Sequence, residues 1–304
     1  MDKKDIVKLF LKNKMLISPR LLDTIKNGDV ERIINTYKSM GVLVADVENE
    51  PKKDIVIKKL GIEKAKIGVS DIVKHNQKKY NILRDILLKK VNAISINNLQ
   101  VTRGDVWIVG MVSEREGNLI VEDMSGNISL ALDEDRKKDI ETGDIIALNG
   151  FYSNGRFVVK NIAWPDVSIE KRKEVIEDKI NLNKIGEGVS IIVGEKSKIE
   201  KDVVNISKDD TPLYIFIGIR EKGCSILVHK ANMNKEECLS VLKKRQIKYK
   251  GGILSLALDK KPDIFWIINK DDWTLNYKGI IIVSLKEDSS AVIDIKNGNV
   301  RINQ

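Results

Sequence analysis

Short apolar segments separated by turns characterise the middle of the chain, between residues 101 and 164. Five of them, VWIVGMVSE, NLIVEDM, NISLALD, DIIALNGFY and RFVVKNIAW, are separated by REG, SG, SNG and the polar stretch DEDRKKDIE. Apolar residues in such runs predict β-strands, and the polar stretch predicts a short helix between the third and fourth strands. Five strands with one helix in that place are the order of an OB-fold barrel, which we expect over residues 92–168.

Helical patterns dominate the chain before the barrel. An apolar stripe and the segment SPRLLDTIKNG, which offers Ser18 as N-cap, predict short helices in a small head over residues 1–45. Residues 46–70 are charged and lack a consistent period, so we expect a flexible linker there. Helical spacing returns in SDIVKHNQKKYNILRDILLKKV, which predicts a helix over residues 71–91 leading into the barrel.

The chain after the barrel is rich in β-branched runs. A charged segment predicts a connector helix over residues 169–188, and SIIVG, PLYIFIGI, CSILVH, GILSLAL, PDIFWII, GIIIVSL and SAVIDI predict strands within residues 189–304. One amphipathic segment, NKEECLSVLKKRQ, predicts a helix capped by Asn234 or Asn232. We therefore expect a β-rich sandwich with helices on its faces, and a multidomain α+β fold for the chain.

Composition narrows the class of protein. The 304 residues are 42% hydrophobic and 32% charged, and neither a long apolar run nor a signal peptide is present, so we expect a cytoplasmic protein. Cys224 and Cys238 are the only cysteines; they do not suggest a disulfide framework and cannot form a zinc site by themselves. We expect two ordinary thiols.

The net charge of +9 is unevenly distributed. Residues 1–90 carry 21 Lys/Arg against 12 Asp/Glu, whereas residues 91–168 carry 7 against 12. The basic part suggests contacts with nucleic acid, and the acidic barrel should repel phosphate. The candidate nucleic-acid contacts are Lys52, Lys53, Lys58, Lys59, Lys78, Lys79, Lys89 and Lys90.

The barrel segment also contains several aromatic residues. In an OB-fold such rings can stack on bases, but that use requires a basic groove, which the strands of this segment do not provide. We therefore interpret them as core residues and as contacts with a protein partner. These candidate partner contacts are Trp107, Phe151, Tyr152, Phe157 and Trp164.

The order of head, linker, barrel and β-rich domain resembles the small subunit of the archaeal D-family DNA polymerase, which is related to the B-subunits of eukaryotic replicative polymerases. The stretch VWIVGMVSEREGNLIVEDMSGNISLALDED carries the resemblance, together with Asn154-Gly155, Phe157-Val158 and Trp164-Pro165-Asp166-Val167 at the exit from the barrel. The resemblance covers most of residues 1–180. It implies that residues 189–304 form a calcineurin-like phosphodiesterase α/β sandwich.

An active phosphodiesterase of that kind holds two metal ions with several carboxylates and histidines. This chain has only His75, which we expect to be solvated, and His229, which we expect to be structural or exposed. The stretch PDIFWIINKD lacks the histidines that the resemblance implies at its end, and the adjacent Asp271 and Asp272 should point to opposite faces of an extended strand. The resemblance thus implies a shortened, degenerate domain with no catalytic residue, metal or cofactor.

Three functions remain as hypotheses. The preferred one is a non-catalytic accessory subunit that binds a D- or B-family polymerase catalytic chain through protein contacts, in replication or repair. The second is a stand-alone DNA-binding protein that uses the basic N-terminal region and the barrel. The third is a minimal metal-dependent phosphodiesterase or nuclease.

Overall fold

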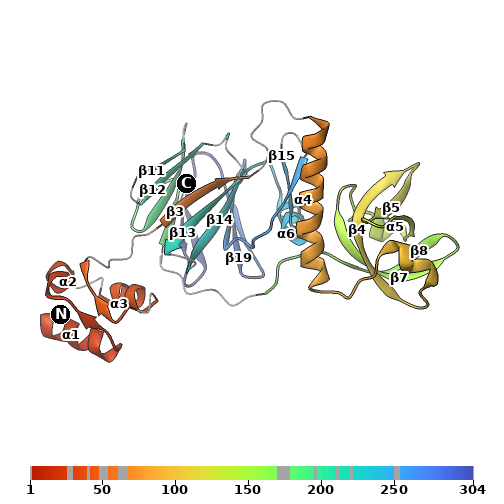
Figure 1. Cartoon of the computed structure of the whole chain (residues 1–304). Helices are drawn as coiled ribbons and strands as arrows, with labels where there is room; N and C mark the ends of the chain where they lie inside the picture. The colour runs from red at the N-terminus through yellow and green to blue at the C-terminus, as the bar shows by residue number, and fades with distance from the viewer. Residues whose placement is uncertain are drawn as a thin grey trace. The chain divides into compact units, whose positions relative to one another are not determined.

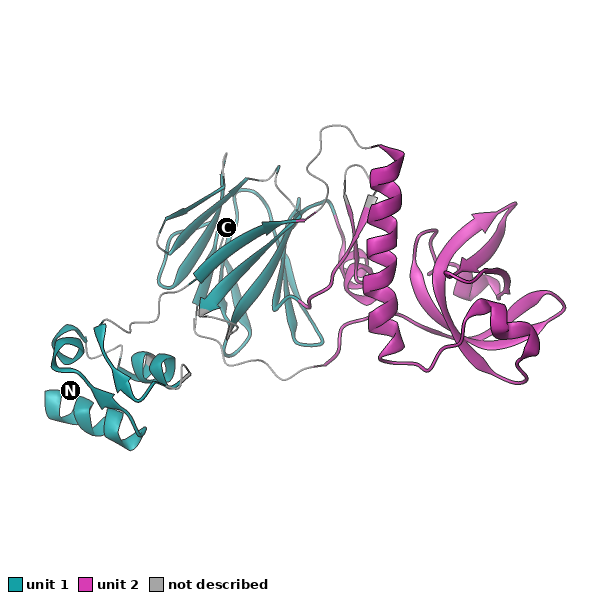
Figure 2. Cartoon of the chain, viewed as in Figure 1, with its two compact units in different colours: residues 1–59, 170–232, 262–304 teal, residues 60–169, 233–261 magenta. Residues whose placement is uncertain are grey.

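The structure is a computed structural model of the whole chain. It describes residues 2–25, 30–39, 42–47, 54–60, 68–169, 179–194, 197–200, 202–207, 209, 212–219, 222–249 and 254–303. The chain divides into two compact units (Figure 2): residues 1–59, 170–232 and 262–304 form unit 1, and residues 60–169 and 233–261 form unit 2. Residues 233–261 interrupt the sequence of unit 1 but belong to unit 2. They are called the insertion below.

Unit 2 contains a closed five-stranded barrel (Figure 1). Its elements are β4 (Val106–Arg115), β5 (Asn118–Glu122), β6 (Asn127–Ala131), α5 (Glu134–Lys137), β7 (Ile145–Ser153) and β8 (Arg156–Ala163), with the 3-10 helix η2 (Ile96–Val101) before them. The strand order is β4-β5-β6-β8-β7, in which only β6 and β8 are parallel. This order, with α5 between the third and fourth strands, is the OB-fold that the sequence predicts.

The barrel is closed around an apolar core, and a bulge bends β7 where it crosses β8. The core contains Ile108, Val112, Val121, Leu148 and Phe157, among others. The register of β7 and β8 shifts at Asn149/Gly150. A Cβ atom on Gly150 would lie 1.9 Å from the carbonyl oxygen of Val158, so only glycine permits this close approach of the two strands.

Helix α4 (Val69–Leu88) packs against the outside of the barrel. Tyr80, Leu83 and Leu87 form a second apolar cluster with residues of β4 and β7. The insertion contributes α6 (Lys235–Lys244), β15 (Gln246–Tyr249) and β16 (Leu254–Ala257), and β16 also contacts α4. Asn234 caps α6, because its Oδ1 accepts a hydrogen bond from the Glu237 amide at 2.9 Å, which confirms one of the two caps predicted.

Unit 1 contains two six-stranded mixed sheets. The first has the order β11-β12-β10-β9-β20-β21 and the second β18-β19-β17-β14-β13-β3. The bounds are β3 (Asp54–Lys59), β9 (Lys179–Leu182), β10 (Val189–Gly194), β11 (Lys198–Glu200), β12 (Val203–Ser207), β13 (Leu213–Ile219), β14 (Lys222–Lys230), β17 (Ile264–Ile268), β18 (Trp273–Tyr277), β19 (Ile280–Leu285), β20 (Ser290–Asp294) and β21 (Asn299–Asn303). One apolar core joins them, with Ile191 and Ile206 from the first sheet and Ile226 and Trp266 from the second. The two sheets therefore form a sandwich.

The sandwich differs from the prediction in three respects. Residues 54–59, inside the predicted linker 46–70, form the edge strand β3, which pairs with β13 over Asp54–Lys59. Residues 179–182, inside the predicted connector helix 169–188, form β9; residues 170–178 lie outside the described part of the chain. The described residues of 179–232 and 262–304 contain no α-helix, since the helix expected on the sandwich belongs to the insertion.

The head of unit 1 contains α1 (Lys3–Lys12), α2 (Pro19–Thr24) and α3 (Val30–Ser39) around its own apolar core. Ser18 caps α2, because its Oγ accepts a hydrogen bond from the Leu21 amide at 3.1 Å. The structure adds a two-stranded parallel ribbon, β1 (Leu16–Ile17) and β2 (Val44–Ala45), that no pattern predicted. Strands of two residues are too short to show a period.

Both cysteines are expected to resist modification in the folded protein. Cys224 and Cys238 are buried, and burial raises the pKa of both thiols, that of Cys238 to about 12. Because the thiolate is the reactive form, a thiol-specific disulfide reagent at pH 8 should label neither cysteine in native buffer and both in denaturant. Rapid labelling of either thiol at the rate of a free cysteine in native buffer would contradict this prediction.

Candidate functional site

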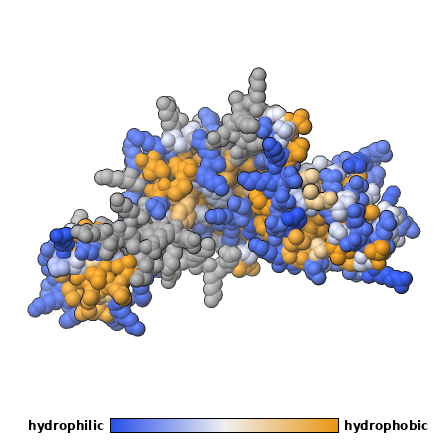
Figure 3. All heavy atoms as spheres, viewed as in Figure 1, coloured by the Kyte–Doolittle hydropathy of each residue, from blue (hydrophilic) through white to orange (hydrophobic). Residues whose placement is uncertain are grey.

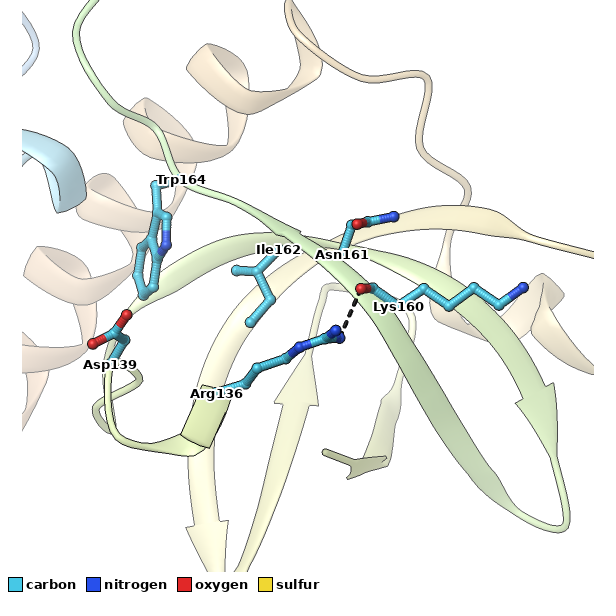
Figure 4. A pocket seen from close by; sticks show the side chains of 6 residues that line it. All are labelled: Arg136, Asp139, Lys160, Asn161, Ile162 and Trp164. Carbon is cyan, nitrogen blue, oxygen red and sulfur yellow. Dashed lines mark hydrogen bonds between the residues drawn. The ribbon is translucent and has the colours of Figure 1, made fainter. Parts of the chain in front are cut away.

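A shallow pocket of about 250 Å³ lies on the barrel, between the α5 region and the end of β8 (Figure 4). Its lining residues are Arg136, Asp139, Lys160, Asn161, Ile162 and Trp164. Figure 4 shows Arg136 reaching toward β8, where its guanidinium donates to the carbonyl oxygen of Lys160 at 2.7 Å. The pocket thus combines an apolar wall with charged groups, of which Arg136 and Lys160 are held by hydrogen bonds.

Cations surround the aromatic ring at one end of the pocket. The ammonium groups of Lys243 and Lys244 lie 5.3 and 5.2 Å from the centre of the Trp164 ring, within the range of cation–π attraction. Lys243 also lies 4.0 Å from Asp139. A similar pair is found along the same strands, where Lys160 lies 5.2 Å from the centre of the Phe151 ring. This outer strip of β7 and β8, with the pocket, is called the Trp164 surface.

A buried ionic network fixes the insertion to the barrel next to this surface. Lys244 Nζ lies 2.8 Å from Asp144 Oδ2, and only 11% and 7% of the two side chains are exposed. Lys244 and Lys248 both pair with Glu141. Burial raises the pKa of Asp144 although Lys244 opposes this, while the hydrogen bond from Lys248 lowers the pKa of Glu141. The network therefore holds α6, and with it Lys243, against the Trp164 ring.

Lys79 on α4 belongs to the same network and not to a nucleic-acid interface. Its Nζ donates to the carbonyl oxygen of Gly143 at 2.9 Å and to Ser255 Oγ at 2.8 Å, and the side chain is buried. Burial lowers its pKa to about 8, with Asp144 acting in the opposite direction. A hydrogen-bonded, buried lysine cannot contact phosphate without leaving this site.

The shifted pKa predicts a pH dependence of stability. Between pH 8 and pH 10.5 the unfolded chain holds a proton on Lys79 that the folded chain has released, so this residue makes stability rise with pH. Relative to Lys79→Met, the wild-type protein should gain about 1 kcal/mol in unfolding free energy between pH 7 and pH 9. Urea unfolding of both proteins at pH 7 and pH 9 measures this gain. If wild type and Lys79→Met differ in unfolding free energy by the same amount at the two pH values, the assigned pKa is contradicted.

The other candidate lysines have several different environments. Lys90 donates to the carbonyl oxygens of Pro165 at 2.6 Å and Asp166 at 2.9 Å, which ties the end of α4 to the chain leaving the barrel. Lys58 and Lys59 are exposed on β3, Lys78 is exposed in the middle of α4, and Lys89 is exposed directly after its last residue. Lys52 and Lys53 lie outside the described residues. The described candidates belong to both units and do not form one cluster within either.

The aromatic candidates also separate into core and surface. Phe157 is fully buried in the barrel core, which excludes the direct partner contact predicted for it. Trp107 packs partly against the α4 cluster, and the rings of Tyr152 and Trp164 both pack partly against the barrel core. Phe151 and Trp164 remain at the Trp164 surface. No sequence pattern pointed to Lys243, which lies far along the chain from Trp164.

The outer face of the second and third strands, which OB-folds commonly use for oligonucleotides together with two neighbouring loops, carries no described Lys or Arg. Here these strands are β5 and β6. Residues of these strands that alternate with core residues are Asn118, Ile120, Glu122, Asn127, Ser129 and Ala131. A carboxylate without basic residues does not attract a phosphate backbone.

The polar residues that follow β17 stabilise a loop. Asp272 accepts hydrogen bonds from the Lys286 amide at 2.7 Å and from Ser289 Oγ at 2.6 Å, and its side chain is buried. Ser284 Oγ donates to the carbonyl oxygen of Asp271 at 2.6 Å and accepts from Asn269 at 3.0 Å. Among the described residues, no group of three His, Cys, Asp or Glu side chains is placed to hold a metal ion.

The two histidines occupy different environments. His75 Nε2 lies 2.8 Å from the carbonyl oxygen of Ser255, so His75 is half-buried and hydrogen-bonded rather than simply solvated as predicted. His229 on β14 is buried, its Nδ1 has no hydrogen-bond partner, and burial lowers its pKa to about 4. A neutral, buried histidine of this kind is a structural residue.

His229 should make the protein less stable in acid. Between pH 6.5 and pH 4 the unfolded chain binds a proton that the folded chain does not, so stability falls as the pH decreases. At pH 5 the wild-type protein should lose about 2 kcal/mol relative to pH 7 through this residue, and His229→Leu should abolish that loss. His75→Gln is the matched control: it keeps His229 and should therefore lose as much stability as wild type between pH 7 and pH 5. If His229→Leu loses as much stability as wild type over the same range, the prediction is contradicted.

Comparison with known proteins identifies one region of similarity. Residues 69–166 match a family described as DNA polymerase epsilon subunit 2-like, OB-fold domain. This range begins with α4 and ends just after β8, so the helix and the barrel are matched together. No curated protein matches the chain.

Among solved structures, the structure of the hypothetical protein ygiW from E. coli is 20% identical and covers 24% of this chain and 89% of its own, with a TM-score of 0.20. That score is too low to support an argument. No described helix is both long and apolar enough to cross a membrane. Through α4 and the barrel, this chain is therefore similar to the OB-fold domain of DNA polymerase epsilon subunit 2-like proteins.

Proposed function

We propose that this chain is a non-catalytic accessory subunit of a DNA polymerase, which binds the catalytic chain of a D- or B-family enzyme through protein contacts. The observation that carries the proposal is the family match of residues 69–166, which coincides with the bounds of α4 and the barrel. The sandwich of unit 1 is, in this proposal, a degenerate phosphodiesterase domain. Its two mixed sheets and the loop-stabilising role of Asp272 support that assignment.

The Trp164 surface is the contact that we assign to the catalytic chain. Buried protein interfaces favour aromatic side chains and arginine, and a few such residues contribute most of the binding free energy. Trp164 and Phe151 are partly exposed and each has a lysine over its ring. The ionic network holds Lys243 and Lys244 in place before binding, which lowers the entropic cost of ordering them.

Affinity isolation of the tagged chain from its native source tests the proposal. We expect mass spectrometry to identify a DNA polymerase catalytic chain, and Trp164→Ala to lower its recovery about tenfold. Met124→Ala, at an exposed position in the same unit, is the matched control and should keep full recovery. Circular dichroism verifies that both variants are folded. If no polymerase or replication protein is recovered with the wild-type chain, the proposal is wrong.

The DNA-binding alternative rests on the exposed lysines of β3 and α4. It predicts a mobility shift of single-stranded or primed DNA at low salt that weakens steeply as salt is added. Lys78→Glu with Lys89→Glu should then reduce binding, whereas Lys79→Met, at the buried position, should not. A shift that all of these variants retain would exclude α4 as the DNA contact.

The phosphodiesterase alternative has a direct test as well. Manganese-dependent cleavage of single-stranded DNA by the wild-type chain, still present in His229→Leu, would overturn the assignment of a non-catalytic subunit. We expect no cleavage above that of a buffer control.

A further inference from the structure

The head carries a group of exposed apolar side chains that its own fold does not bury. They are Leu11, Leu16, Leu43 and Val44, of which Leu43 is 74% exposed. An apolar area is visible on the head in the space-filling view (Figure 3). We call these four residues the head patch. Single exposed apolar residues are ordinary, but a contiguous group on a small unit indicates an interaction site.

The short parallel ribbon brings three members of the patch together, Leu16, Leu43 and Val44, while Leu11 lies near the end of α1. Leu16 and Val44 are register partners on β1 and β2, and the Leu16 amide donates to the carbonyl oxygen of Leu43 at 2.8 Å. Successive strand residues point to opposite faces. Ala45 is accordingly buried in the core of the head while Leu16 and Val44 are exposed. The patch is thus a consequence of the ribbon and is not due to poor packing.

Lysines gather at the same end of the head. Helix α1 ends at Lys12 just before β1, and α3 ends shortly before β2, so the two helix C-termini lie where the ribbon begins. Lys38 Nζ lies 3.3 Å from Asn13 Oδ1, which places the ends of α1 and α3 side by side. Lys12, Lys14 and Lys38 are all exposed there.

The acidic groups of the helices are placed elsewhere. Asp5 is in the first turn of α1 and Glu31 in the first turn of α3, while Asp23 pairs with Lys3. Lysines in a last helical turn stabilise the helix dipole, which accounts for Lys12 and Lys38. That role does not account for the exposed leucines beside them. Asp46, directly after β2, is half-buried, whereas the three lysines are exposed. The head therefore presents exposed apolar side chains together with exposed lysines.

We propose that the head patch binds a short segment of another protein in which apolar anchor residues are flanked by Asp or Glu. The apolar anchors would cover Leu16, Leu43 and Val44, and the flanking carboxylates would pair with Lys12, Lys14 and Lys38. Charge complementarity selects this partner over a basic or a purely apolar one. The inference is independent of the polymerase proposal, because it uses neither the barrel nor its family match.

Selection of short random peptides displayed on phage against the full-length chain tests the inference. Enriched peptides should combine Leu, Ile or Phe with Asp or Glu. In a fluorescence titration, Leu16→Ser with Leu43→Ser should weaken the best peptide by about tenfold or more, as expected for interface anchors. Lys12→Glu with Lys14→Glu should also weaken it, and so should added salt.

Val101→Ser is the matched control, since Val101 is 83% exposed but lies in unit 2; it should leave peptide binding unchanged. Thermal unfolding verifies that the head variants remain folded, which their exposure leads us to expect. The inference is overturned if no peptide is enriched, or if the head variants bind the enriched peptides as tightly as wild type. It is also overturned if sedimentation shows self-association that depends on Leu43, because the patch then pairs with a second copy.

Discussion

Replacing Asp144 with alanine is expected to lower the free energy of unfolding by about 3–5 kcal/mol, the cost of breaking a buried ion pair by removing one partner. Asp144 is the buried carboxylate that faces Lys244 at 2.8 Å, and it also interacts electrostatically with the buried Lys79. Without it, two cations remain in a site from which water is largely excluded. Urea unfolding followed by circular dichroism measures the change.

Asp135→Ala is the matched control for this prediction. Asp135 also pairs with a lysine, Lys138 at 2.8 Å, but 91% and 73% of the two side chains are exposed. Surface pairs of this kind contribute at most about 1 kcal/mol, so the control should be close to wild type. Similar losses in both variants would show that the pair between Asp144 and Lys244 is not protected from solvent.

Phe157→Ala should destabilise the protein by about 3–5 kcal/mol, because it creates a cavity in the centre of the barrel core. Phe151→Ala, on the neighbouring strand, should cost about 1 kcal/mol or less, since its ring is half-exposed. The pair distinguishes two roles that the sequence could not separate. If Phe157→Ala is as stable as wild type but no longer binds the protein partner, the burial of Phe157 is contradicted. The partner contact predicted for this residue from the sequence would then be supported.

The same contrast explains why Phe157 was wrongly included among the candidate partner contacts, while the contacts expected of the other rings stay predictions. Phe157 and Phe151 lie on neighbouring strands whose side chains alternate between the two faces of the sheet. The alternation places the two rings on opposite faces, but it does not show which face is inside the barrel. The bulge at Asn149/Gly150 further changes the facing of the residues along β7 and β8. The sequence therefore left all five rings as candidate partner contacts without showing which belong to the core, whereas closure of the barrel separates them.

The lysines show a related limit. Lys78 and Lys79 are neighbours in sequence, yet Lys78 is exposed and Lys79 donates to Gly143 and Ser255. Those acceptors are distant in sequence, and Ser255 belongs to the insertion. A basic run in one segment cannot reveal partners that another segment provides.

Residue patterns were enough to predict the OB-fold, α4 and the capped starts of α2 and α6, because these depend on contacts between residues close in sequence and on a regular apolar period. Three features could be found only in the folded chain: the edge strand formed by residues 54–59, the membership of the insertion in the barrel unit, and the Trp164 surface. An edge strand, a buried ion pair and a cation over a ring each depend on two groups that are far apart in sequence. No local sequence pattern specifies which distant residue will provide the second group.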